Sequence, residues 1–238
     1  MIKDNLAVVR RNIAEAAKRA GRRPEDIALV CVTKQASIEQ IKEAIGLGIT
    51  NIAENRVQDA VEKHEEIASV ASLPRNDGGV RWHLIGHLQT NKVKKAVEIF
   101  DLIHSVDSLR LAEEISKEAA KIGKVQDILI QVNTSGEETK FGITPEELKS
   151  LIVNIVRLNN INILGLMTIA PLVDDVEKAR PCFKRLRELL KGDCFARHRN
   201  SGGLAMTATQ LSMGMSQDYQ VAIEEGATIV RIGSAIFK

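Results

Sequence analysis

Ile27-Ala-Leu-Val-Cys-Val-Thr33 is an almost continuous apolar run, and Lys34 follows it directly. A run of this kind is typical of a strand that is buried on both faces, as in a parallel sheet. The segment before it, from Ile2 to Ala17, has apolar residues at helical spacing, and Gly21 and Pro24 then favour a helix end. The chain is therefore predicted to open with one helix and to enter a parallel sheet.

The rest of the chain alternates between strand patterns and helix patterns. Strands are expected at residues 51–53, 80–85, 102–106, 127–132, 161–167, 211–213 and 228–232. Helices are expected at residues 37–45, 55–69, 90–100, 108–122, from 144, at 176–190, at 216–225 and from 234. Ser37 and Gln40 are placed as a capping box, and Thr144-Pro-Glu-Glu147 is expected to open a helix with a cap.

This order of elements predicts the fold. Strict β-then-α alternation predicts parallel strands joined by right-handed crossovers, and eight such units favour a closed barrel over an open doubly wound sheet. We therefore expect an α/β chain in which residues 1–238 form a single domain. That domain is predicted to be a (β/α)8 TIM barrel with an extra N-terminal helix. Residues 72–79 are expected to be a loop, and residues 192–210 fit no element.

Composition agrees with this fold and narrows the function. The length of 238 residues is close to the ~250 that are typical of one such barrel. Hydrophobic residues make up 44% of the chain, enough for a sizeable core, and the 27% of charged residues suit a soluble surface. A net charge of +2 gives no reason to expect a polyanionic partner, and 3% of aromatic residues argue against base stacking. We expect no nucleic-acid partner.

The cysteines and the N-terminus indicate a cytoplasmic protein. The three cysteines, Cys31, Cys182 and Cys194, are odd in number and form no C-x-x-C pair, so neither a disulfide framework nor a zinc ribbon is predicted. The amphipathic N-terminal segment carries acids and does not resemble a signal peptide. No apolar run reaches the ~18 residues that could span a membrane. We expect no membrane association.

Two pairs of possible metal ligands are present in the sequence, one of two histidines and one of a cysteine and a histidine. His83 and His87 are four residues apart, as are Cys194 and His198, but no further ligands are evident for either pair, so no metal site is predicted. No Walker A or G-x-G-x-x-G motif is present, which argues against nucleotide binding.

Lys34 is the first candidate for chemistry, because active sites of this fold lie at the carboxyl ends of the strands. A lysine at the barrel mouth is expected to be partly desolvated, which lowers its pKa and leaves more neutral amine. A neutral amine can attack an aldehyde to form a Schiff base. The alternative is a lysine that reaches into solvent or pairs with an acid.

A phosphate cradle is the second candidate. Ser212 and Gly214 come from the seventh predicted strand and the loop after it, and Gly233 and Ser234 follow the eighth. Phosphate sites of this fold often use these two loops and a helix N-terminus. The alternative is that these residues are only turns and caps. Amine and cradle together suit a phosphorylated aldehyde, either pyridoxal phosphate or the sugar phosphate of an aldolase.

Six blocks along the chain resemble the pyridoxal phosphate homeostasis protein family, the small relatives of the N-terminal barrel of alanine racemase. They are VTK at 32–34, AENRVQ at 53–58, WHLIGHLQTNK at 82–92, GLMTIAP at 165–171, LSMGMSQD at 211–218 and VRIGSAIF at 230–237. They cover nearly the whole chain, in order. The resemblance implies an alanine racemase N-terminal-like barrel with pyridoxal 5′-phosphate (PLP) as cofactor.

The resemblance also implies roles for individual residues. Lys34 would carry PLP as an internal aldimine, and Arg231 would face the pyridine nitrogen. The phosphate would be held by Ser212, Gly233 and Ser234. Positions that line the pocket in the family are matched by Asn55, His83 and Met167.

The family resemblance further implies a carrier. Arginine has no acceptor, so Arg231 should discourage protonation of the pyridine nitrogen and make the cofactor a weaker electron sink. Racemisation also needs a second proton-transferring group, which alanine racemase takes from a tyrosine of a second domain. The only tyrosine here, Tyr219, is expected to turn outward.

We therefore expect a monomeric PLP homeostasis protein that delivers PLP to PLP-dependent apoenzymes and is not itself an enzyme. A PLP-dependent amino-acid racemase is the alternative, and a Schiff-base aldolase is a weaker one.

Overall fold

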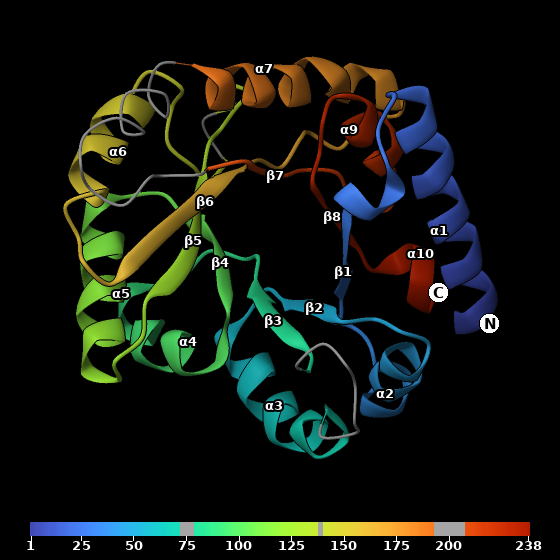
Figure 1. The fold of residues 1–238 in the computed structure, drawn as a ribbon, viewed down its shortest axis with the longest axis horizontal. Coiled ribbons are helices and arrows are strands. Elements are labelled where there is room, and N and C mark those ends of the chain that lie inside the picture. Colours follow the sequence, from blue (N-terminus) through green and yellow to red (C-terminus); the bar gives the residue numbers. More distant parts are fainter. Residues whose placement is uncertain (72–78, 138–139, 193–207) are drawn as a thin grey trace.

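Eight parallel strands close into a barrel in sequence order (Figure 1). The computed structural model describes residues 1–71, 79–137, 140–192 and 208–238. The strands are β1 (Ala28–Val32), β2 (Asn51–Glu54), β3 (Arg81–Leu84), β4 (Leu102–Val106), β5 (Gln126–Gln131), β6 (Ile161–Met167), β7 (Gln210–Ser212) and β8 (Ile229–Ile232). The pairing of β1 with β8 closes the barrel. The predicted (β/α)8 barrel is confirmed.

Helices cover the outside of the barrel. They are α1 (Ile2–Arg19), α2 (Ile38–Gly46), α3 (Val57–Ala71), α4 (Val93–Ile99), α5 (Leu109–Lys121), α6 (Leu148–Ile155), α7 (Arg180–Lys191), α9 (Tyr219–Glu224) and α10 (Ser234–Phe237). Short 3-10 turns are η1 (Pro24–Asp26), η2 (Thr90–Lys92) and η3 (Val176–Ala179).

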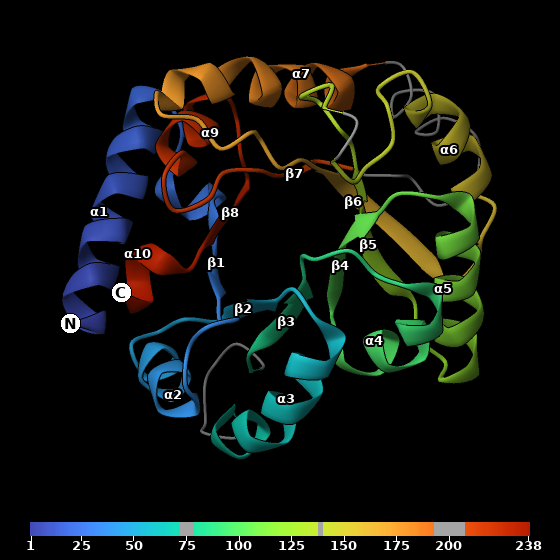
Figure 2. The ribbon, with the colours of Figure 1, turned by 180° about the vertical axis from the view of Figure 1, so that it is seen from behind.

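The extra N-terminal helix closes one side of the molecule. Figures 1 and 2 show α1 lying along α9 and α10 in both views. The Asn5 side chain donates to the carbonyls of Ile236 and Lys238, at 3.0 and 3.1 Å. The first helix and the last one therefore lie side by side, and α1 covers the segment that follows β7 and β8.

Two helix starts were predicted from capping patterns, and the structure confirms one of them. At α2 the predicted capping box is confirmed: Ser37 Oγ accepts from the Gln40 backbone, and Gln40 Oε1 accepts from the Ser37 backbone. The prediction that a helix opens at Thr144 is wrong, because α6 begins only at Leu148. The Thr144 backbone and hydroxyl both donate to Glu147 Oε2, at 2.8 and 2.9 Å, so the threonine side chain caps no helix and residues 145–147 form a turn.

The strands bury side chains on both faces. One apolar cluster, which includes Val30, Leu129 and Met167, fills the barrel interior, and the alternate positions pack against the helices. Trp82 of β3 lies in the outer layer, where its ring packs 5.3 Å from that of His64 in α3. Among the described residues, no helix is both long and apolar enough to cross a membrane.

Candidate functional site

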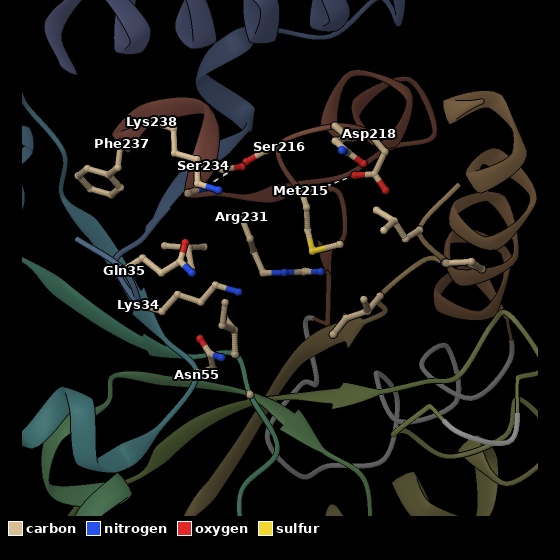
Figure 3. Close-up of a pocket in the computed structure, with 18 of the residues that line it drawn as sticks. Lys34, Gln35, Asn55, Met215, Ser216, Asp218, Arg231, Ser234, Phe237 and Lys238 are labelled. Atoms are coloured by element: carbon tan, nitrogen blue, oxygen red, sulfur yellow. Dashed lines mark hydrogen bonds between the residues drawn. The ribbon is translucent and has the colours of Figure 1, made fainter. Parts of the chain in front are cut away.

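A cavity of about 860 Å³ lies at the carboxyl ends of the strands, where this fold places its active sites (Figure 3). It is bordered by residues that follow β1, β2, β3, β6, β7 and β8. Five of the residues predicted for the site line it, namely Lys34, Asn55, Arg231, Gly233 and Ser234. The topology therefore gathers residues from both ends of the chain at one cavity.

Lys34 extends from the end of β1 into this cavity. Figure 3 shows its amine pointing toward the cavity centre, on the same side as the Arg231 guanidinium. The side chain is nevertheless exposed to solvent. The partial desolvation that we expected from its position at a strand end is therefore wrong, because the mouth is open above it.

A buried acid anchors the backbone beside Lys34. Glu54, at the end of β2, is fully buried, and its Oε1 accepts from the Thr33 hydroxyl at 2.6 Å. Lys63 of α3 donates to the same oxygen and to the Thr33 carbonyl, both at 2.7 Å. These charge-assisted bonds fix the residue that immediately precedes Lys34. They give the lysine a rigid base from which to reach the cavity.

Backbone donors converge on one oxygen at the opposite wall. The N–H groups of Gly233 and Ala235 both donate to Ser216 Oγ, each at 3.3 Å. A Cβ on Gly233 would lie 2.9 Å from the Val32 carbonyl oxygen, so only glycine allows β1 and this loop to approach so closely. Two N–H groups aimed at one oxygen form an arrangement suited to an anion.

Ser216 is a site residue that sequence reasoning missed. It lies in the LSMGMSQD block, from which we chose Ser212. Between the two serines the chain turns at Gly214, whose φ of +91° is one that L side chains rarely adopt. This turn carries Ser216 to the cavity wall and leaves Ser212 below.

Ser212 lies inside the barrel and does not line the cavity. Its Oγ accepts from Arg231 Nη1 at 2.6 Å and lies 2.9 Å from His104 Nδ1. The hydroxyl therefore faces its partners inside the barrel, whereas Gly233 and Ser234, the other residues predicted to hold the phosphate, line the cavity.

Arg231 brings a buried positive charge to the cavity wall. Only 3% of the residue is exposed, and besides Ser212 it donates through Nη2 to the Thr168 carbonyl at 2.9 Å. Burial lowers the pKa of Arg231 to about 10, and nearby Asp218 opposes that shift. The guanidinium is therefore still protonated at neutral pH, and it can only donate.

His83 and Met167 also lie below the cavity and do not line it, contrary to the prediction. Met167 belongs to the apolar barrel interior. His83 is 3% exposed, with Nδ1 2.9 Å from His104 Nε2 and Nε2 3.1 Å from Asn51 Oδ1. Both side chains point inward from their strands, so they lie in the barrel interior below the cavity floor.

The geometry of the mouth and the chain's relatives point to one family. The model of the alanine racemase N-terminal domain matches residues 5–238. The chain belongs to this family.

Relatives of the alanine racemase N-terminal domain family match nearly the full chain. A pyridoxal phosphate homeostasis protein of Aquifex aeolicus is 44% identical, over 98% of this chain and 96% of its own. A crystal structure of an unknown protein from Bifidobacterium adolescentis is 38% identical with a TM-score of 0.89, and the match covers 99% of this chain and 94% of that one. PipY of Synechococcus elongatus, solved with PLP bound, is 33% identical with a TM-score of 0.83, and the match covers both chains completely.

Tyr219 does not turn outward, so our expectation for it is wrong. In this member of the alanine racemase N-terminal domain family the residue is 4% exposed, and its hydroxyl accepts from Asn12 of α1 at 3.0 Å. The reason is that α1 packs over α9, which buries the first residue of that helix. Tyr219 is also absent from the residues that line the cavity.

His83 and His87 have different surroundings. His87 lies 3.5 Å from Asp107 and stacks on Phe141, with ring centroids 4.3 Å apart, whereas His83 points into the barrel. Among the described residues no three His, Cys, Asp or Glu side chains gather as a metal site would require. Cys194 and His198 lie outside the described residues.

The buried histidines predict a stability that falls in acid. Burial lowers the pKa of His83 to about 3, with a smaller contribution from Arg81, and it lowers that of His104 well below its usual value. Below pH 6.5 the unfolded chain binds a proton at His83 that the native state refuses until about pH 3. Lowering the pH from 7 to 5 should therefore cost about 2 kcal/mol of unfolding free energy through His83 alone.

Urea unfolding at both pH values measures this loss. In His83→Gln, most of the ~2 kcal/mol loss that we assign to His83 is expected to disappear, to within about 1 kcal/mol. His87→Gln changes a more exposed histidine, and this variant should lose as much unfolding free energy between pH 7 and pH 5 as the wild type. An equal loss between pH 7 and pH 5 in wild type and His83→Gln contradicts the prediction.

Proposed function

We propose that this protein binds pyridoxal 5′-phosphate and serves its intracellular homeostasis, with Lys34 holding the aldehyde as a Schiff base. The main support for the proposal is that the Lys34 amine points into the same cavity that Ser216 and Gly233 line (Figure 3). The N–H groups of Gly233 and Ala235 converge on Ser216 Oγ at this wall. An amine and an anion cradle facing one cavity suit a phosphorylated aldehyde. The Aquifex aeolicus relative is named a pyridoxal phosphate homeostasis protein, and PipY was solved with PLP bound; both support this choice of ligand.

The remaining cavity residues fit the same ligand. Arg231 offers N–H donors to a ring nitrogen, and Asn55 has a buried Oδ1 without a hydrogen-bond partner among the described residues. A polar atom buried in this way costs free energy unless a ligand or water satisfies it. When bound, PLP supplies an electrophilic carbonyl, and the chain supplies the amine, the phosphate donors and the fixed charge.

Ser216→Ala is expected to weaken PLP affinity by about 1 kcal/mol, roughly fivefold, through the loss of one hydroxyl at the proposed phosphate site. Titration with PLP and with inorganic phosphate measures the effect, and both ligands should lose affinity in parallel. Ser150→Ala, which removes an exposed hydroxyl of α6 that donates to the Glu147 carbonyl and does not line the cavity, is the matched control. Unchanged affinity for both ligands in Ser216→Ala contradicts this placement of the phosphate.

We propose a carrier and not a catalyst. Arg231 donates toward the cavity from a buried position, and the sole tyrosine is tied to α1 outside it. The exposed Lys34 leaves the bound aldehyde open to attack by water or by another amine, which suits delivery of PLP to PLP-dependent apoenzymes. We propose that the protein works in the cytoplasm, because a reducing compartment keeps thiols such as Cys31 and Cys182 free. We further propose that it acts as a monomer.

Transfer and racemisation assays separate the carrier from the enzyme. The PLP-loaded protein is mixed with an apoenzyme, and recovery of that enzyme's activity reports transfer. Incubation of the loaded protein with single amino-acid enantiomers reports inversion. Transfer without inversion supports the carrier, whereas inversion above that of free PLP supports the racemase and contradicts our proposal.

A further inference from the structure

A line of hydrogen-bonded polar side chains crosses the barrel interior beneath the cavity. It runs from Arg231 Nη1 to Ser212 Oγ at 2.6 Å, and from there to His104 Nδ1 at 2.9 Å. From His104 Nε2 it continues to His83 Nδ1 at 2.9 Å, and from His83 Nε2 to Asn51 Oδ1 at 3.1 Å. Each of the first four residues is at most 3% exposed. Buried polar groups of this kind must satisfy one another, because water does not reach them.

The chemistry of Arg231 determines the direction of the line, that is, which atom donates and which accepts in each hydrogen bond. Arginine has no acceptor, so Ser212 Oγ accepts from it and has its own proton left to donate. The other atom that Ser212 Oγ meets is His104 Nδ1, which must therefore be the acceptor. In a neutral ring the proton then lies on Nε2, where it is donated to His83 Nδ1. By the same step His83 carries its proton on Nε2 and donates it to Asn51 Oδ1.

The opposite direction leaves a proton without a partner. With the His104 proton on Nδ1, Ser212 Oγ would receive two donors, and its own hydroxyl proton would meet no acceptor among the described residues. Asn51 supports the first direction as well, because its Nδ2 donates to Thr50 Oγ1 and leaves Oδ1 toward His83. One arrangement therefore satisfies every group in the line.

We propose that His104 is a positioning residue for ligand binding: as the acceptor for Ser212, it fixes Ser212 as the acceptor for Arg231 and so holds the guanidinium at the cavity wall. This rests on the proposed function, in which Arg231 meets the PLP ring. The charged groups that act on the line are Asp218, near Arg231, and Arg81, near His83. Neither replaces His104, because neither is hydrogen-bonded to Ser212 among the described residues.

Nitrogen NMR of the histidine rings tests the direction in the ligand-free protein. Both His83 and His104 are expected to be neutral with the proton on Nε2, near pH 7. A proton on Nδ1 of either ring overturns the proposal. This readout needs no PLP, so it decides the direction of the line even if the protein binds no PLP at all.

Two substitutions at position 104 test the positioning role. Asparagine can place its carbonyl oxygen near the position of the histidine Nδ1, so His104→Asn keeps an acceptor for Ser212, whereas His104→Leu fills the space without one. We expect His104→Leu to weaken PLP affinity about tenfold and His104→Asn to weaken it less than about threefold. The side-chain N–H signals of Arg231 should be distinct in wild type and His104→Asn, and averaged in His104→Leu.

A control separates positioning from general destabilisation. Gln126→Leu removes another fully buried polar side chain, one that bonds the Asp101 and Asp127 carbonyls away from the line. It should keep wild-type PLP affinity and distinct Arg231 signals. Equal affinities in His104→Leu, His104→Asn and wild type overturn the positioning role. Wild-type protein that binds no PLP contradicts the proposed function instead.

Discussion

Lys34→Ala is expected to abolish covalent retention of PLP while the barrel stays folded. In the proposed site Lys34 supplies the only bond to the aldehyde, and the phosphate donors alone should hold PLP reversibly. The side chain is exposed at the mouth, so its removal should change the unfolding free energy by less than about 0.5 kcal/mol. Borohydride reduction of the loaded protein, followed by mass spectrometry of the peptides, measures the adduct, and urea unfolding checks the fold.

Lys238→Ala is the matched control, because this second lysine also lines the cavity. It should retain the adduct on Lys34 at the wild-type level. An adduct that persists in Lys34→Ala, on Lys238 or elsewhere, contradicts the assignment of the amine. Absence of any adduct in the wild-type protein contradicts the Schiff base itself.

Gly214→Ala is expected to destabilise the protein by about 3 kcal/mol and to remove the phosphate site with it. Gly214 has a φ of +91°, and an added Cβ would lie 2.6 Å from the Ala222 Cβ and 2.9 Å from the Tyr219 Cα. The free-energy cost of the left-handed backbone and the cost of the crowding against α9 add to one another. The same turn places Ser216, so any protein that still folds should bind inorganic phosphate poorly. Urea unfolding and phosphate titration measure the two effects.

Gly123→Ala isolates the backbone part of this effect. Gly123 has a φ of +65° after α5, and an added Cβ there would meet nothing within 4 Å. The change should cost about 1 kcal/mol and leave phosphate binding unaltered. If the two alanine variants lose equal stability, the predicted crowding at Gly214 is absent.

The fold could be predicted because its signals are local and repeated. Continuous apolar runs such as that in β1 mark strands buried on both faces, and alternation with helix patterns fixes their order. The start of α6 was predicted too early. The Thr144 hydroxyl donates to the Glu147 side chain and does not accept from a backbone N–H as a helix cap would, and residue spacing alone does not distinguish these two cases. Which barrel end carries the site followed from the fold alone.

The depth of each side chain could not be predicted. Lys34 was expected to be partly desolvated and is exposed, since the width of the mouth depends on loops from other strands. Ser212 and Ser216 lie four residues apart in one block, and the turn at Gly214 decides which of them meets the cavity. His104 could have been noticed as a polar residue within a buried strand pattern, yet its partners come from β3 and β7.

Trp82, packed in the outer layer of β3, is the only tryptophan in the chain. Its ultraviolet emission therefore comes from a single, water-shielded indole, one position away from His83. Pyridoxal chromophores absorb at the wavelengths where tryptophan emits, so loading should quench this fluorescence by resonance energy transfer. The wild-type protein thus contains an intrinsic optical sensor, and uptake and release of the vitamin can be followed in real time without a label.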